Sequence, residues 1–176
     1  MNSIIYGLAV VALVPSWYYV SVNEQYLAAT LPSECNKVLD SVIFYEPGLV
    51  YPYLTCMGEF GRAKQMDFYK FDLIFPFIFG MYDYGSLTRL WPEARASMGA
   101  FGLLTTLFDQ LENTFTILAL VKFPEQIHAL AVGVSVFAGL KWVFFFASSA
   151  VVLAGLARLV LRAVLPGKTT LTKKTN

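Results

Sequence analysis

Four long apolar stretches alternate with polar segments along the chain. They cover residues 3–20, 67–90, 96–121 and 127–165. A helix that spans a bilayer needs about 20 mainly apolar residues, and each stretch provides roughly that length. The last stretch exceeds one crossing at about 1.5 Å per residue, so we expect it to tilt or to project beyond the membrane. The pattern predicts an all-α fold, a polytopic membrane four-helix bundle.

The segment 21–66 separates the first two stretches and is rich in proline and glycine. Within it, the amphipathic piece 36–44 predicts a short helix. We therefore expect a long, partly helical first loop that forms an extramembrane cap, and a basic tail at 166–176. The chain 1–176 then forms a single transmembrane domain, with no room for a separate soluble catalytic domain.

The first stretch has no basic leader and no small-residue cleavage pattern, and Trp17, Tyr18 and Tyr19 follow its apolar core directly. These features favour a retained first helix with an aromatic interfacial anchor over a secretory signal.

Basic residues set the expected orientation, because they favour the inner face of a membrane. They cluster after the fourth stretch and between the second and third: Arg158, Arg162, Lys168, Lys173 and Lys174, and Arg89 and Arg95. Both termini are therefore predicted inside and the cap outside. The host membrane would be the mitochondrial inner membrane or endoplasmic reticulum in a eukaryote, or the plasma membrane in a bacterium. The ending Lys173-Lys174-Thr175-Asn176 also matches a dilysine retrieval pattern.

Composition fits a membrane protein, with 57% hydrophobic and 14% charged residues. The net charge of +1 provides no electrostatic footprint for nucleic acid. Cys35 and Cys56 both lie in the cap, and with one histidine in the chain they cannot complete a four-ligand zinc site. They are either two free thiols or one disulfide. We expect no metal and no cofactor.

Polar residues inside the third stretch follow helical spacing. Thr105, Asp109, Glu112 and Thr116 lie at offsets 0, 4, 7 and 11, with Asn113 beside them. That spacing places all five on or next to one helix face, which must point into the bundle.

The second stretch repeats this spacing with Asp72, Pro76, Gly80 and Asp83. Pro76 frees a backbone carbonyl between the two acids. For each aspartate taken separately, we favour an interfacial location over a ligand role, because each lies within about two turns of a helix end.

The fourth stretch carries Lys141 next to Trp142. At about 1.5 Å per residue, Lys141 and Glu112 reach similar depths, so their charged ends could meet. We predict an intramembrane polar network or ligand pocket formed by Asp72, Asp109, Glu112, Asn113, Lys141 and Trp142. Two interpretations stay open: the network only fixes helix register, or it binds a ligand. Lys141 could also extend outward along its alkyl stem.

Small residues recur along the fourth stretch at steps of three and four. They are Ala147, Ala150, Ala154 and Ala157. This spacing predicts a seam for close helix packing.

Several motifs carry a resemblance, and they fall in this order: Gly61-Arg62, Phe71-Asp72 with Phe75-Pro76 and Gly80, Phe108-Asp109 with Leu111-Glu112-Asn113, and Lys141-Trp142. The order resembles a family of uncharacterised four-helix membrane proteins common in bacteria, over about 58–156. The resemblance implies a fold and no activity. In outline the chain is also similar to the four-helix family of sterol isomerases and sigma-2-type receptors, which hold a cationic or sterol-like ligand between acidic side chains.

Three functions follow as hypotheses. The first is a non-enzymatic accessory or scaffold subunit of a larger, for example energy-transducing, membrane complex, with lipids and protein partners or further copies of the chain around it. The second is a binder or isomerase of a hydrophobic amine, sterol or lipid that uses Asp109 and Glu112, and it requires an inter-helix cavity that reaches them. A proton-coupled carrier ranks last. We favour the first, because the sequence shows no nucleophile, metal set or phosphate loop.

Overall fold

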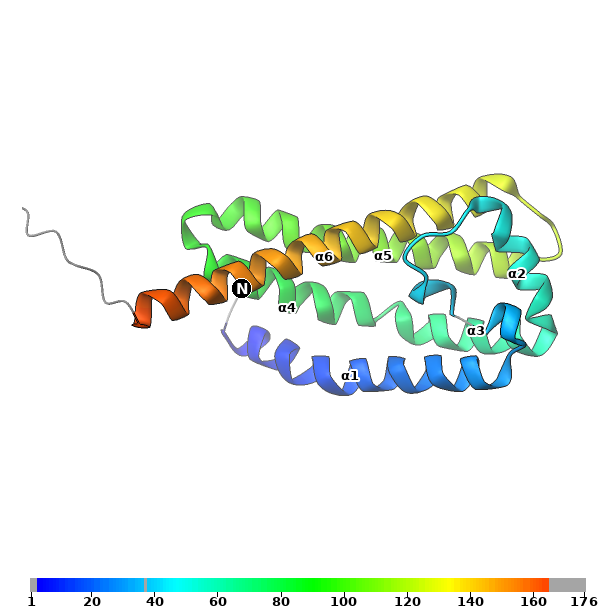
Figure 1. Cartoon of the computed structure of the whole chain (residues 1–176), viewed down its shortest axis with the longest axis horizontal. Helices are drawn as coiled ribbons and strands as arrows, with labels where there is room; N and C mark the ends of the chain where they lie inside the picture. Colours follow the sequence, from blue (N-terminus) through cyan, green and yellow to red (C-terminus); the bar gives the residue numbers. More distant parts are fainter. Residues whose placement is uncertain (1–2, 37, 165–176) are drawn as a thin grey trace, which may run out of the picture.

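The computed structural model describes residues 3–36 and 38–164, and its elements are all helical (Figure 1). The α-helices are α1 (Ser3–Thr30), α2 (Val50–Cys56), α3 (Gly58–Asp72), α4 (Phe75–Leu90), α5 (Arg95–Lys122) and α6 (His128–Val164). Short 3-10 turns are η1 (Ser33–Cys35), η2 (Leu39–Ser41), η3 (Pro47–Leu49) and η4 (Pro92–Ala94). No strand occurs in the part of the chain that the structure describes.

The predicted boundaries need three corrections. The first helix continues ten residues beyond residue 20, to Thr30. The second is interrupted at residues 73–74, which separates α3 from α4. The predicted cap helix at 36–44 is wrong for its described residues, which contain only the turn η2, and the cap helix is instead α2. The expected tail lies outside the described residues.

Two helices, α1 and α6, are long and apolar enough to cross a membrane among the residues described. Large apolar side chains cover the outer face of α1, where Ile4, Val11 and Val14 are each at least 70% exposed. A lipid environment would solvate such a surface, whereas water would not. Four crossings remain a prediction.

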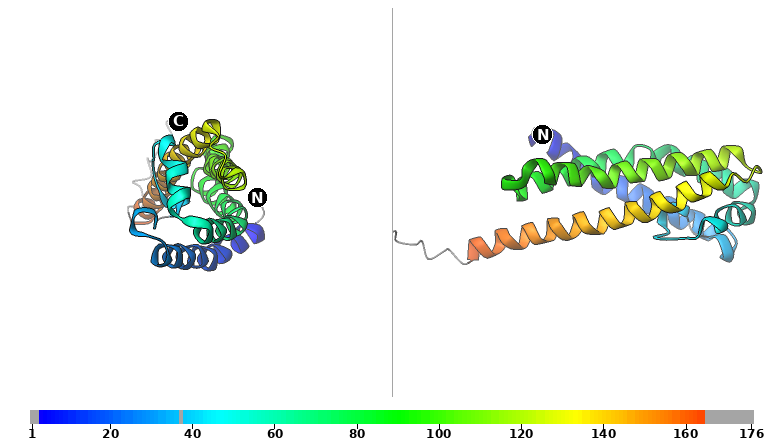
Figure 2. Two further views of the ribbon diagram at one scale, coloured as in Figure 1. Left: turned by 90° about the vertical axis from the view of Figure 1, so that its right-hand side faces the viewer. Right: turned by 90° about the horizontal axis from the view of Figure 1, so that it is seen from above.

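Four helical segments run along the long axis of the molecule: α1, the α3–α4 pair, α5 and α6 (Figure 1). The helix α4 packs against α1, α5 and α6, and α5 and α6 form the most extensive pair. Seen from the end, α2 and the loop before it lie across one end of the bundle (Figure 2). At the other end, the last turns of α6 extend beyond α4 and α5 in both side views (Figures 1 and 2).

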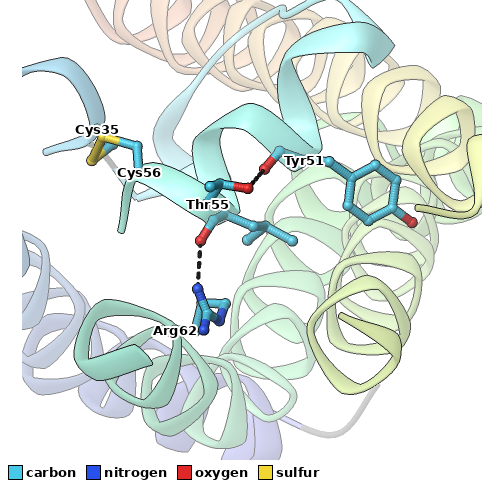
Figure 3. Close-up of a disulfide and its surroundings, with 6 residues drawn as sticks. Cys35, Tyr51, Thr55, Cys56 and Arg62 are labelled. Carbon is cyan, nitrogen blue, oxygen red and sulfur yellow. Dashed lines mark hydrogen bonds between the residues drawn. A yellow bond between two sulfur atoms is a disulfide. The ribbon is translucent and has the colours of Figure 1, made fainter. Parts of the chain in front are cut away.

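A disulfide closes the cap on itself, and hydrogen bonds hold the cap to the bundle. Cys35 and Cys56 form a disulfide across 21 residues (Figure 3), so of the two alternatives left open by the sequence, the structure has the bonded one. Arg62 donates to the carbonyl of Leu54 at 2.9 Å (Figure 3). The hydroxyl of Tyr51 also accepts from the backbone N–H of the residue that precedes α6, at 2.8 Å. The loop therefore has a defined position.

The break between α3 and α4 is satisfied by polar side chains of α5. Pro76 has no N–H, so the carbonyl of Asp72, four residues earlier, loses its helical partner. Asn113 Nδ2 donates to that carbonyl at 3.1 Å, and Gln110 Nε2 donates to the next carbonyl at 2.9 Å. Thr106 Oγ1 donates to the carbonyl of Pro76 at 2.9 Å. Part of the polar face of α5 thus donates hydrogen bonds to backbone carbonyls at the junction of α3 and α4.

The predicted alanine seam on α6 is wrong. Ala150, Ala154 and Ala157 are exposed, and the buried positions nearby are Ser148, Val152 and Gly155. A Cβ on Gly155 would lie 2.8 Å from the Cβ of Leu90. The small residue at this contact is a glycine on a different face of the helix.

Gly80 allows α4 to approach α5 closely. A Cβ at this position would lie 2.1 Å from Thr106 Oγ1 and 3.2 Å from Thr106 Cβ. Thr106 cannot rotate away without losing its hydrogen bond to Pro76. The contact therefore requires glycine.

We expect Gly80→Ala to lower stability by about 1–3 kcal/mol, because the added methyl group overpacks the α4–α5 contact. Thermal melting in mild detergent would measure the change. Gly139→Ala is the matched control, since its Cβ would meet Phe44 at 3.5 Å, an ordinary contact. Equal melting temperatures for the two variants would contradict the close approach.

Candidate ligand-binding site

Lys141 lies at the centre of a buried ionic cluster. Its side chain is 7% exposed, and Nζ lies 2.6 Å from Glu112 Oε2 and 3.7 Å from Asp109 Oδ1. Both acids come from α5, four and seven residues after Thr105, on the face that the sequence spacing indicated. Lys141 therefore joins α6 to α5 and does not extend outward.

Asp40, in the turn η2, is a partner that the sequence did not reveal. Its carboxylate forms an ion pair with Lys141, and its backbone carbonyl accepts from Lys141 Nζ at 3.0 Å. A second contact between the loop and α6 is the hydrogen bond that Ser135 donates to the carbonyl of Tyr45. The loop thus contributes one carboxylate to the cluster, and the ion pair of this carboxylate with Lys141 attaches the loop to α6.

Asp72, Asn113 and Glu112 complete the buried side of the cluster. They are 2%, 0% and 0% exposed, so the protein itself encloses all three side chains. The interfacial depth expected for Asp72 stays a prediction. Asp72 interacts electrostatically with Asp40 and Asp109. Its Oδ2 atom has no hydrogen-bond partner among the described residues.

Asp83 does not belong to this cluster. It is 1% exposed, so the protein encloses it as well, and the interfacial depth expected for it stays a prediction. It lies eleven residues after Asp72, beside Ser148 of α6. The second stretch therefore places its two acids at different levels of the bundle.

A cavity of about 170 Å³ opens against the cluster. Its polar wall includes Glu24, Asp40, Asp109 and Lys141, together with the hydroxyl-bearing residue Thr105. Its apolar wall is largely aromatic and consists of Trp17, Val20, Phe75, Phe79, Trp142 and Phe145. The cavity thus joins an acidic end to an aromatic surface, a combination that suits an amphiphilic ligand.

A second hollow, of about 300 Å³, shares Trp17 and Phe79 with the first and continues along α1 to Leu13 and Val14. Only apolar and aromatic side chains line it. The two hollows together run from the carboxylates to the apolar outer face of the bundle.

Carboxyl groups outnumber basic groups at the acidic end. Five carboxyl groups interact with the single ammonium of Lys141: Glu24, Asp40, Asp72, Asp109 and Glu112. In the adjoining loop, burial raises the pKa of the Tyr45 hydroxyl, and the charge of Glu112 acts in the same direction. The Tyr45 phenol therefore stays neutral beside the cluster.

The opposite end of the bundle holds an ordinary surface ion pair. Arg158 of α6 pairs with Glu93 of η4 and lies 5.0 Å from the ring of Trp91. A hydrogen bond from its own backbone N–H lowers the pKa of Glu93, and the bond from Arg158 lowers it further.

The residues predicted from the sequence are brought together. Lys141, Asp109, Glu112 and Asp72 form one cluster, and Trp142 lines its cavity. Asn113 donates a hydrogen bond to the backbone carbonyl of Asp72. The comparisons with protein-family models, with curated proteins and with solved structures find no match for this chain. Its chemistry therefore has to be inferred from this geometry.

We expect Lys141→Met to destabilise the bundle by about 3–5 kcal/mol, because Glu112 would remain buried without its cation. Thermal melting in mild detergent would show the loss, and adding Glu112→Gln should recover part of it. Arg158→Met, which removes the exposed pair with Glu93, is the control and should change melting little. Similar effects of Lys141→Met and Arg158→Met would contradict a structural role of the cluster.

Proposed function

We propose that the chain crosses the membrane four times, through α1, the α3–α4 pair, α5 and α6, with both termini inside. Successive helical segments run in opposite directions along one axis, and this arrangement supports the topology (Figure 1). Two of them, α1 and α6, pass the length and hydropathy requirement for a span. The others carry acids, of which Asp72, Asp83 and Glu112 are buried between the helices. Glu59 and Asp67 of α3 are exposed and lie towards the cap end.

The cluster would then lie near the outer boundary of the hydrocarbon core. Lys141 precedes Arg158 by 17 residues, about 25 Å along α6, and Glu24 follows Ser3 by 21 residues, about 31 Å along α1. The hydrocarbon core is about 30 Å thick. Leu13 and Val14 lie about 15 Å deeper than Glu24.

We expect residue 59, at the start of α3 beside the cap, and residue 95, at the start of α5, to face opposite sides of the membrane. Both side chains are exposed, so Glu59→Cys and Arg95→Cys should tolerate labelling. In sealed vesicles that present the cap outward, a membrane-impermeant maleimide should label Glu59→Cys at once and Arg95→Cys only after permeabilisation. Labelling of both from the same side would contradict this topology.

The function that this arrangement supports best is binding of an amphiphile with a cationic head group. Its head would lie among Glu24, Asp40 and Asp109, and its apolar part would follow Trp17 and Phe79 towards the lipid. The observation that carries the proposal is the cavity itself, because it reaches the intramembrane carboxylates. Hydrophobic amines are the class that complements both ends, since carboxylates in excess attract an ammonium group and aromatic faces also bind cations.

An accessory or scaffold subunit is the second candidate function. Beyond Arg158, α6 presents Leu159, Val160, Leu161 and Val164, each at least 50% exposed. This end of α6 extends past its neighbours (Figure 2), so it offers an apolar surface to another membrane protein or to lipid.

We expect a long-chain alkylamine to bind the purified chain, and the alcohol of the same chain length to bind at least about tenfold more weakly, because only the amine carries a charge for the carboxylates. Asp109→Asn should weaken amine binding, whereas Asp83→Asn, which lies outside the cavity lining, should not. Native mass spectrometry of protein extracted in mild detergent would measure both ligands.

Equal binding of amine and alcohol would overturn the amine proposal. The same spectra test the second candidate: co-purified subunits would support a scaffold, and a lone chain that carries an amphiphile would support the pocket.

A further inference from the structure

Three aspartates from different parts of the chain meet beside the acidic end of the cavity, and two of them, Asp40 and Asp109, line it. Asp40 comes from the loop, Asp72 from the end of α3 and Asp109 from α5. One carboxylate oxygen of each lies within 4.8 Å of the other two. Oxygen ligands of Mg²⁺ or Ca²⁺ lie about 2.0–2.6 Å from the ion, so two ligands on opposite sides are about 4–5 Å apart. The three oxygens thus have the spacing of ligands around one ion.

Two buried polar groups beside these oxygens lack a partner. Asp72 is 2% exposed, and its Oδ2 atom makes no hydrogen bond within the described ranges 3–36 and 38–164. Thr105 is 3% exposed and lines the cavity, and its Oγ1 atom is likewise without a partner there. Burying such groups unpaired is costly, so both indicate a bound species that satisfies them.

Lys141 does not supply the missing charge. Its ammonium is paired with Glu112 and Asp40, and it lies 3.7 Å from Asp109. No ion pair joins it to Asp72 in the described part of the chain. One divalent ion together with Lys141 carries three positive charges, enough to balance three ionised carboxylates of the cluster.

We propose that Asp40, Asp72 and Asp109 bind one hard divalent cation at the inner end of the cavity, with the hydroxyl of Thr105 in reach of its coordination sphere. All of these donors are oxygen atoms, the preferred ligands of Mg²⁺, Mn²⁺ and Ca²⁺, whereas typical zinc sites include histidine nitrogen or cysteine sulfur. A carboxylate has two oxygens, so Asp40 can hold Lys141 on one and the ion on the other. The ion site shares Asp40 and Asp109 with the proposed head-group site, so an ion and a cationic head group compete for them, and Glu24 is the lining carboxyl that the ion leaves to the head group. The ion site goes beyond the proposed amphiphile binding.

Mn²⁺ is a suitable probe, because the electron paramagnetic resonance signal of free Mn²⁺ falls as the ion binds. The full chain, purified in mild detergent and stripped with a chelator, should bind one Mn²⁺. Asp72→Asn and Asp40→Asn should each raise the apparent Kd at least about tenfold, as loss of a metal-site interaction does. Asp83→Asn is the matched control: it removes an equally buried acid eleven residues further along, and binding should stay as in the unmodified chain.

Failure of the folded, unmodified chain to bind Mn²⁺ would overturn the proposal, as would equal weakening by Asp83→Asn and Asp72→Asn. If Asp72→Asn does not fold, Asp40→Asn decides, because Asp40 is a partly exposed loop residue. No alkylamine is added during the Mn²⁺ titration, and the alkylamine binding measurement is repeated with a chelator present. Each proposal can therefore fail without the other.

Discussion

The ammonium group of Lys141 is the point on which the arrangement of the chain depends. It joins α6 to α5 through Glu112 and Asp109 and to the loop through Asp40. A buried charge is tolerated only when its partners surround it, so these segments have to meet at one level of the bundle. The aromatic cavity borders this meeting point, and its wall comes from α1, the loop, α4, α5 and α6.

A second constraint comes from the backbone of α3 and α4. Proline at position 76 leaves the carbonyl of Asp72 without its helical donor, and the side chain of Asn113 replaces that donor. Gln110 and Thr106 donate to the nearby carbonyls of Leu73 and Pro76. In a lipid environment, water cannot do so. The polar face of α5 therefore serves two purposes: three of its residues hold a broken neighbour helix, and Asp109 and Glu112 hold Lys141.

Much of this could be predicted from the sequence, because long apolar runs end at clear signals and helical spacing identifies shared faces. The predicted limits of α5 and α6 agree with the structure to within one residue, and the meeting of Lys141 with Glu112 followed from depth alone. Asp40 could not be found, because a loop residue has no periodicity that indicates its partner. Gly155 was missed in favour of alanines, since the spacing of small residues does not show which face of α6 meets α4.

The disulfide has a consequence for the entropy of the site. The disulfide joins Cys35 and Cys56, which are 21 positions apart, and Asp40 lies between them. A closed segment samples fewer conformations than an open one, so less freedom is lost when Asp40 docks on Lys141. The disulfide thus favours the ionic contact between Asp40 and Lys141, because it lowers the entropy that the loop loses when this contact forms. On a membrane face where thiols stay reduced, the same carboxylate would have to be recruited from a much broader ensemble.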